Sequence, residues 1–144
     1  MVELTFDRTY AAPRRLVWDA WTDPDQIARW WGPAGVTTPR ESVVLDLRPG
    51  GRFEFVMVDD ATGTRFPNGG TLREVDPPAR LVWDDDGFPD GSGRGTATVT
   101  FTELGPDSTR LQVHLVADFD DTVRAGAEQG WGSQLDKLTQ LLAR

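Results

Sequence analysis

Two segments in the second half of the chain alternate apolar and polar side chains, and this pattern constrains the fold more than any other. Residues 95–104 place Ala97, Val99 and Phe101 opposite a row of threonines, and residues 109–117 alternate leucine and valine with polar side chains in the same way. Such alternation is typical of antiparallel strands with one dry and one wet face. The dry face must be covered by another layer of structure.

Other segments also have strand character and are separated by turns rich in glycine and proline. We expect these strands at residues 2–10, 43–47, 52–59, 70–75 and 80–85. Residues 60–68 are expected to form a loop, and the acidic, glycine-rich residues 84–95 a mobile loop. Gly50 and Gly51 follow Pro49 and predict a hairpin turn; a phosphate-binding loop is disfavoured because no helix follows them.

The C-terminal segment changes to a helical period. Over residues 121–144, apolar side chains recur at spacings of three and four, which predicts one long amphipathic helix. Its inner face comprises Val123, Ala127, Trp131, Gln134 or Leu135, Leu138, Leu141 and Leu142. This helix is the only expected element long enough to lie across the sheet.

Two short helices are expected directly after the first strand. Pro13 opens the first of them, which ends near Thr22. Its predicted inner face consists of Leu16, Val17, Ala20 and Trp21. The second helix has Asp23 as its N-cap, Pro24 at its first position and Gln26 completing a capping box. Gly32 and Pro33 end it.

The expected order of elements is therefore a strand, two short helices, about six strands and a long helix, in one domain of 144 residues. We predict an α+β fold in which a curved antiparallel sheet wraps around the terminal helix and the short helices close one end. A curved sheet does not seal against a cylinder, so a cavity between them is expected. Its predicted lining is apolar and consists of Phe53, Phe55, Met57, Leu81, Trp83, Val99, Phe101, Leu111, Val113 and Leu115, facing Trp131, Leu135 and Leu138.

Four of the six tryptophans lie within residues 18–31. Each can bury about 150–250 Å² and needs a partner for its N–H group. We expect Trp18, Trp21 and Trp30 to anchor the helical pair on the sheet. Trp31, just before Gly32, is expected to lie near the entrance of the cavity.

The sequence contains few candidates for catalysis. His114, the only histidine, falls on the wet face, and one histidine with no cysteine excludes the usual zinc sites. Asp46 and Arg48 flank one strand residue and favour a structural ion pair, with ligand orientation as the alternative. The many loop carboxylates are interpreted as a solvated acidic surface. Glu54 should point outward. No nucleophile elbow, phosphate loop or metal-ligand spacing is present, so no catalytic residue and no cofactor is predicted.

Composition narrows the choice of partners. The formal net charge of −8 disfavours nucleic acid, whose phosphates need clustered Lys and Arg. The sequence has no apolar run of about 18 residues, so no membrane span is predicted. With no cysteine and no secretory leader, a cytoplasmic location is expected. A homodimer remains open.

Several motifs in register carry a resemblance to a known family. They are AAPRRLVWDAWTDPDQIARWWGP, LDLRPGGRF, GTLREVDPPARLVW, TVTFTEL and a late GW followed by L..L..LL. The chain resembles the activator-of-Hsp90-ATPase-homologue-like family of the START / Bet v 1-like helix-grip superfamily (SRPBCC) over essentially its whole length. The resemblance implies a helix-grip fold with a deep pocket and a small-molecule role. The chain departs from the family pattern at Leu72, where relatives often carry an aromatic residue, and in the short acidic loop FPDGSG. Both positions are expected to touch the pocket or its mouth.

Three functions are compatible with these observations. The favoured one is a binding protein for a small hydrophobic or aromatic ligand. The second is a cyclase- or hydrolase-like enzyme acting in the same pocket, which would require an ionisable residue on the dry face. The third is a chaperone-associated adaptor, as the family name suggests; an exposed apolar patch on the outer side of the sheet would favour it.

Overall fold

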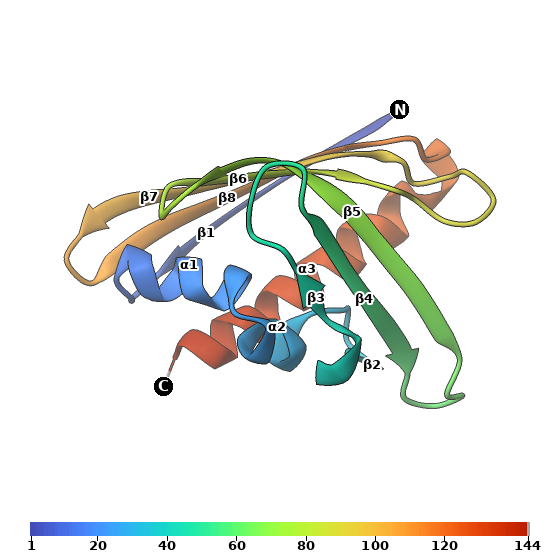
Figure 1. The fold of residues 1–144 in the computed structure, drawn as a ribbon, viewed down its shortest axis with the longest axis horizontal. Coiled ribbons are helices and arrows are strands. Elements are labelled where there is room, and N and C mark those ends of the chain that lie inside the picture. Colours follow the sequence, from blue (N-terminus) through green and yellow to red (C-terminus); the bar gives the residue numbers. More distant parts are fainter. Residues whose placement is uncertain (144) are drawn as a thin grey trace.

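The computed structural model describes residues 1–143, which form one curved antiparallel sheet around a long helix (Figure 1). The sheet order is β1-β8-β7-β6-β5-β4-β2, and the short strand β3 also pairs with β4. The elements are β1 (Val2–Tyr10), α1 (Arg14–Thr22), α2 (Pro24–Trp30), β2 (Val36–Thr37), η1 (Arg40–Ser42), β3 (Val44–Leu45), β4 (Arg52–Asp59), β5 (Arg65–Asp76), β6 (Arg80–Asp85), β7 (Gly95–Gly105), β8 (Ser108–Ala117), η2 (Asp121–Val123) and α3 (Arg124–Leu142). This confirms the predicted helix-grip architecture.

The helix α3 lies across the concave face of the sheet, while α1 and α2 cover that face toward the end where the chain terminates (Figure 1). Leu135 and Leu138 of α3 are buried. On the sheet, the inward residues of β7 and β8 form matched buried pairs, with Val99 opposite Val113 and Phe101 opposite Leu111. The period-two alternation of these strands therefore produces the dry face that it predicts.

Several predicted boundaries are wrong. The strand expected at residues 43–47 is reduced to β3, Val44–Leu45. The strand expected from residue 70 begins at Arg65, because Pro67 is accommodated opposite Val56 in the β4–β5 ladder and does not end the strand. The expected loop at 60–68 is correspondingly shorter. The long helix begins at Arg124 and not at residue 121, so the exposed Val123 belongs to η2. Its predicted end at residue 144 lies outside the described residues.

The first short helix differs from its prediction in two details. Pro13 precedes α1 as its N-cap residue, and its carbonyl accepts the first hydrogen bonds, from the N–H groups of Leu16 and Val17. Leu16 is 53% exposed, so it does not belong to the inner face. That face is formed by Val17, Ala20 and Trp21, together with Trp18.

The corner between α1 and α2 depends on Asp23. Its carboxylate accepts the N–H of Asp25, as expected of an N-cap. The predicted capping box is wrong, because the Asp23 N–H already donates to Asp19 O at the end of α1. Gln26 instead donates its side-chain amide to the Asp23 carboxylate at 3.3 Å.

Trp30 satisfies a carbonyl group that this corner leaves without its helical partner. The Ala20 carbonyl would normally accept a hydrogen bond from residue 24, but Pro24 has no N–H. The Trp30 indole Nε1 donates to Ala20 O at 2.8 Å, and both residues are fully buried. The tight corner and the tryptophan-rich sequence are therefore parts of one arrangement.

Replacement of Trp30 by phenylalanine should destabilise the fold by more than the loss of ring size alone. The substitution leaves a buried carbonyl without a partner, which costs about 1–3 kcal/mol in addition to the lost packing. Trp83→Phe is the matched control, because Trp83 is also buried but makes no hydrogen bond through its indole within residues 1–143. Urea denaturation of both variants measures the difference, and equal losses would contradict this role for Trp30.

Candidate functional site

The space between the sheet and α3 is filled at one end and open at the other. At the filled end, Trp18 packs edge-on against Phe101 with ring centroids 5.2 Å apart, and Trp21 lies against Trp30 at 4.7 Å. The open end is a cavity of about 230 Å³ beneath the other ends of the same strands. The helical pair therefore closes one half of the grip, and the cavity occupies the half that these tryptophans do not reach.

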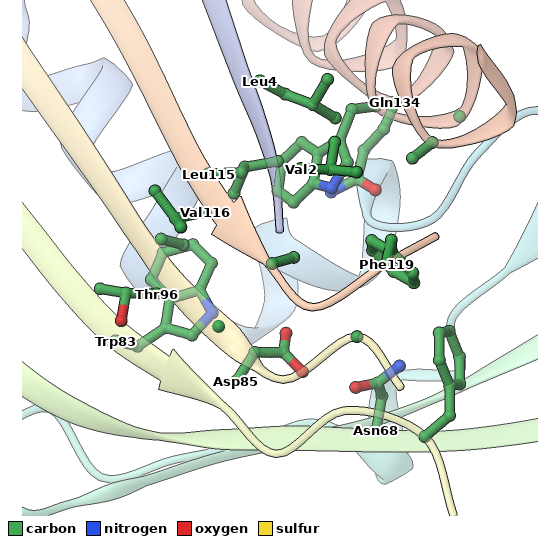
Figure 2. A pocket seen from close by; sticks show the side chains of 18 of the residues that line it. Val2, Leu4, Asn68, Trp83, Asp85, Thr96, Leu115, Val116, Phe119 and Gln134 are labelled. Atoms are coloured by element: carbon green, nitrogen blue, oxygen red, sulfur yellow. The ribbon is translucent and has the colours of Figure 1, made fainter. Parts of the chain in front are cut away.

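The cavity is bounded by the N-terminal half of α3 and by one end of the strands β1, β6, β7 and β8 (Figure 2). Gly95, Thr96 and Ala97 come from the start of β7, and they pair with the last residues of β8. The full lining is Val2, Leu4, Trp31, Pro33, Phe55, Met57, Asn68, Trp83, Asp85, Phe88, Gly93, Gly95, Thr96, Ala97, Leu115, Val116, Ala117, Phe119, Ala127, Gly130, Trp131 and Gln134. Most of these side chains are apolar.

Five residues of the predicted site line the cavity: Trp31, Phe55, Met57, Trp83 and Trp131. The others are buried but lie outside the lining, namely Phe53, Leu72, Val99, Phe101, Leu111, Val113 and Leu135. Of the three further residues expected there, Leu115 lines the cavity, whereas Leu81 and Leu138 are buried elsewhere. The inward face was predicted correctly for these residues, but their position along the strand or helix decides whether they reach the cavity.

Trp31 forms the wall between the filled half and the cavity. Its ring centroid lies 5.2 Å from that of Phe53, 5.3 Å from that of Phe55 and 5.7 Å from that of Trp131. It is 4% exposed, so it is a buried wall of the cavity. Trp18, Trp21 and Trp30, which were expected to anchor the helical pair on the sheet, lie outside the lining. Trp18 and Trp21 both pack against Phe101 of β7.

The loop after Trp31 is held against α3 by polar contacts. The Lys137 ammonium group donates to the carbonyl oxygens of Gly32 at 3.0 Å and Val36 at 3.1 Å. The Ala34 N–H donates to Ser133 Oγ at 3.0 Å. Desolvation by burial lowers the pKa of Lys137. These contacts tie the segment after Trp31, which borders the cavity, to α3.

Asp85 is the one ionisable side chain among the lining residues of the described chain. It ends β6 two positions after Trp83, so both side chains lie on the concave face, and Figure 2 shows the carboxylate directed into the cavity beside Asn68. In the pairing register its neighbours are Gly70 and Gly95, and Ala117 lies beyond Gly95. The structure thus places on the dry face an ionisable residue of the kind that an enzyme acting in this pocket would require.

The surroundings of Asp85 disfavour its charge. Burial raises the pKa of its carboxyl group; the hydrogen bond from the Gly87 N–H opposes this shift, and the charge of Asp86 adds to it. The flanking acids are different, because Asp84 pairs with Arg73 at 3.3 Å and Asp86 with Arg52 at 2.5 Å on the outside of the sheet. The interpretation of this acidic run as solvated surface is therefore wrong for its middle member.

The other charged residues singled out in the sequence lie outside the cavity. Arg48 Nε and Asp46 Oδ2 are 2.7 Å apart and exposed, which confirms the structural ion pair. His114 Nε2 lies 3.5 Å from Glu3 Oε1 on the outer face, and Glu54 is exposed. Within residues 1–143, no cluster of three or more acidic or histidine side chains could hold a metal ion. No helix in the same range has the length and apolar content needed to span a bilayer.

Residues 11–143 match the family model described as "Activator of Hsp90 ATPase homolog 1-like protein". The chain belongs to this family. No curated protein shows significant similarity to it. Members of the family share its helix-grip fold, so the architecture and the recognised motifs agree.

Solved structures of bacterial proteins are similar over nearly the whole chain. A protein from Nitrosomonas europaea is 29% identical, with a TM-score of 0.82 and coverage of 99% of this chain and 94% of that one. A protein from Chromobacterium violaceum is 26% identical, with a TM-score of 0.87 and coverage of 99% and 97%. An AHSA1 protein from Silicibacter pomeroyi is also 26% identical, with a TM-score of 0.82 and coverage of 99% and 98%.

Replacement of Asp85 by asparagine should stabilise the unliganded protein at neutral pH, by on the order of 1 kcal/mol, because it removes a desolvated charge and keeps an oxygen for the Gly87 N–H. The pKa of Asp85 is higher in the folded than in the unfolded protein, so protonated Asp85 contributes to the stability of the wild type in acid. The wild type loses this contribution as the pH rises from 3.8 through the raised pKa. The advantage of the variant should therefore disappear in acid. Thermal unfolding between acidic and neutral pH measures it, with Asp86→Asn as the control that should give no gain. A pH-independent difference would contradict the assignment.

Proposed function

We propose that this protein binds a small apolar, aromatic-rich molecule in the cavity between the sheet and the N-terminal half of α3. The observation that carries the proposal is a cavity of about 230 Å³ that remains where the rest of the same interface is closely packed with aromatic rings. Apolar pockets with a few polar groups are the usual form of small-molecule sites. A cavity of this volume accommodates a molecule of two or three aromatic rings.

The composition of the wall supports an aromatic ligand. Trp31, Trp83 and Trp131 contribute three indole rings to the lining of the cavity, and Phe55 adds a fourth aromatic side chain. Aromatic side chains interact favourably with rings through offset-stacked or edge-to-face contacts. Four polar side chains are in the lining, and the Thr96 hydroxyl already donates to Asp84 at 2.8 Å. Asn68, Asp85 and Gln134 are left to orient such a ligand.

The segment from residue 86 to 94 forms part of the wall, through Phe88 and Gly93. Its backbone is tied to the end of β8, since Gly93 N donates to Asp118 O at 2.9 Å. Phe88 lies against Phe119 with ring centroids 6.3 Å apart. The position expected from the FPDGSG motif, at the pocket, agrees with this arrangement, and we infer that a ligand enters beside these two phenylalanines.

A variant that fills the cavity should lose binding without loss of fold. Ala127 lines the cavity from α3, whereas Ala125 is exposed on the same helix. We expect Ala127→Trp to weaken binding of the neutral fluorescent probe N-phenyl-1-naphthylamine by roughly tenfold or more, because the indole occupies the volume that the probe needs. Ala125→Trp is the matched control and should bind like the wild type.

Titration of the probe by its fluorescence enhancement measures this effect, and circular dichroism checks that both variants are folded. Equal affinity of the two variants, or no binding by the wild-type protein, would contradict a ligand site in this cavity. If the wild type binds the probe, native mass spectrometry of the protein purified from its own host should detect a retained small molecule. That molecule should be absent from Ala127→Trp.

A further inference from the structure

The carboxylate of Asp85 lies in the cavity without a cation of the protein to balance it. Within residues 1–143, no arginine, lysine or histidine lies within ion-pairing distance of it, and the one hydrogen bond that its side chain accepts comes from the Gly87 N–H at 2.9 Å. The neighbouring acids Asp84 and Asp86 each have an arginine. Asp85 is half-buried, and a charge held at the wall of an apolar cavity without a cation of the protein is costly. Groups of this kind are concentrated at functional sites.

A second polar group on the opposite wall is also incompletely satisfied. Gln134 projects from α3 into the lining, is 5% exposed, and its Nε2 makes no hydrogen bond to any of the described residues. Figure 2 shows Gln134 on the helix side of the cavity and Asp85 on the sheet side. An amide N–H buried in this way requires an acceptor, because leaving it without one costs about 1–3 kcal/mol.

The chemistry between these two groups is aromatic. Trp83 precedes Asp85 by two residues on the same face of β6, and Trp31 and Trp131 line the same space. The face of an indole ring attracts a cation placed over it. An ammonium group next to Asp85 would therefore pair with the carboxylate inside an aromatic-walled cavity, whereas a second anion would be repelled. The net charge of −8 also favours the approach of a cation.

We propose that the ligand is an apolar aromatic amine, whose ammonium group pairs with Asp85 and whose ring system carries an acceptor atom for the side-chain amide of Gln134. This inference rests on the proposed function, since it names the class of molecule that the cavity takes. The aromatic body fills the space between the tryptophans, and the two polar contacts fix its direction. The raised pKa of Asp85 in the unliganded protein is consistent with a carboxylate that gains its partner only on binding.

The test compares three naphthyl ethers of nearly equal size that differ in charge: 2-(1-naphthyloxy)ethylamine, 2-(1-naphthyloxy)ethanol and (1-naphthyloxy)acetate. Isothermal titration calorimetry at neutral pH measures their affinities for the wild-type protein. We expect the amine to bind about tenfold or more tightly than the alcohol, and the acetate more weakly than both. Equal affinities, or a preference for the acetate, would overturn the proposal while leaving an apolar binding function intact. Failure of all three to bind would overturn both.

Variants assign the preference to particular residues. Asp85→Asn should abolish the advantage of the amine without weakening the alcohol, and the higher thermal stability expected of this variant shows that it is folded. Asp86→Asn removes the same charge outside the cavity and should keep the preference, which separates ion pairing from general attraction to an acidic protein. Gln134→Met should weaken the amine and the alcohol by the same factor, of several fold, because both lose the contact to the ether oxygen. A preference that survives in Asp85→Asn would overturn the ion pair, and unchanged affinities in Gln134→Met would overturn the hydrogen bond.

Discussion

One curved sheet covered by one helix is the constraint on which the rest of this structure depends. The concave face of the sheet is wider than a helix can cover, so additional side chains must fill the remaining volume or leave it empty. The chain fills one half with Trp18, Trp21 and Trp30, carried by two short helices, and leaves the other half open. The cavity is therefore a result of where the tryptophans end along the sheet.

The corner between α1 and α2 shows how closely this filling is linked to the backbone. Pro24 shortens the connection between the helices and removes a hydrogen-bond donor, and Trp30 replaces that donor with its indole N–H at 2.8 Å from Ala20 O. The next residue, Trp31, then forms the wall of the cavity. A local requirement of the helical corner thus determines where the packed half stops and the open half begins.

Much of this arrangement could be predicted from the period of the sequence. Alternation in residues 52–59, 95–104 and 109–117 identified the inward side chains correctly, including Phe53, Val99 and Leu111. Alternation does not encode how far along each strand the short helices α1 and α2 and their tryptophans reach. The residues of the buried core could therefore not be separated from those of the cavity wall. The start of β5 is hard to predict because it contains Pro67. A proline has no N–H to donate to a neighbouring strand, so it is rare within a sheet and usually indicates that no strand is present.

Asp85 was missed for a different reason. Its place in a run of three aspartates indicated a solvated loop, yet extending the alternation by one step from Trp83 places its side chain inward. At the end of this strand the period therefore indicates an inward side chain, whereas the acidic composition indicates a solvated one. Gln134 was considered only as an alternative to Leu135 on the inner face of the helix; the structure buries both, and only Gln134 reaches the cavity.

The position of Lys137 has a consequence for chemical labelling. It is the only lysine in the sequence, and its amine is occupied by the carbonyl groups of Gly32 and Val36 beside the cavity wall. An amine-reactive reagent therefore meets a single lysine side chain in this sequence, and that side chain is hindered. Acylation of Lys137 itself would report that the segment after Trp31 had moved away from the helix.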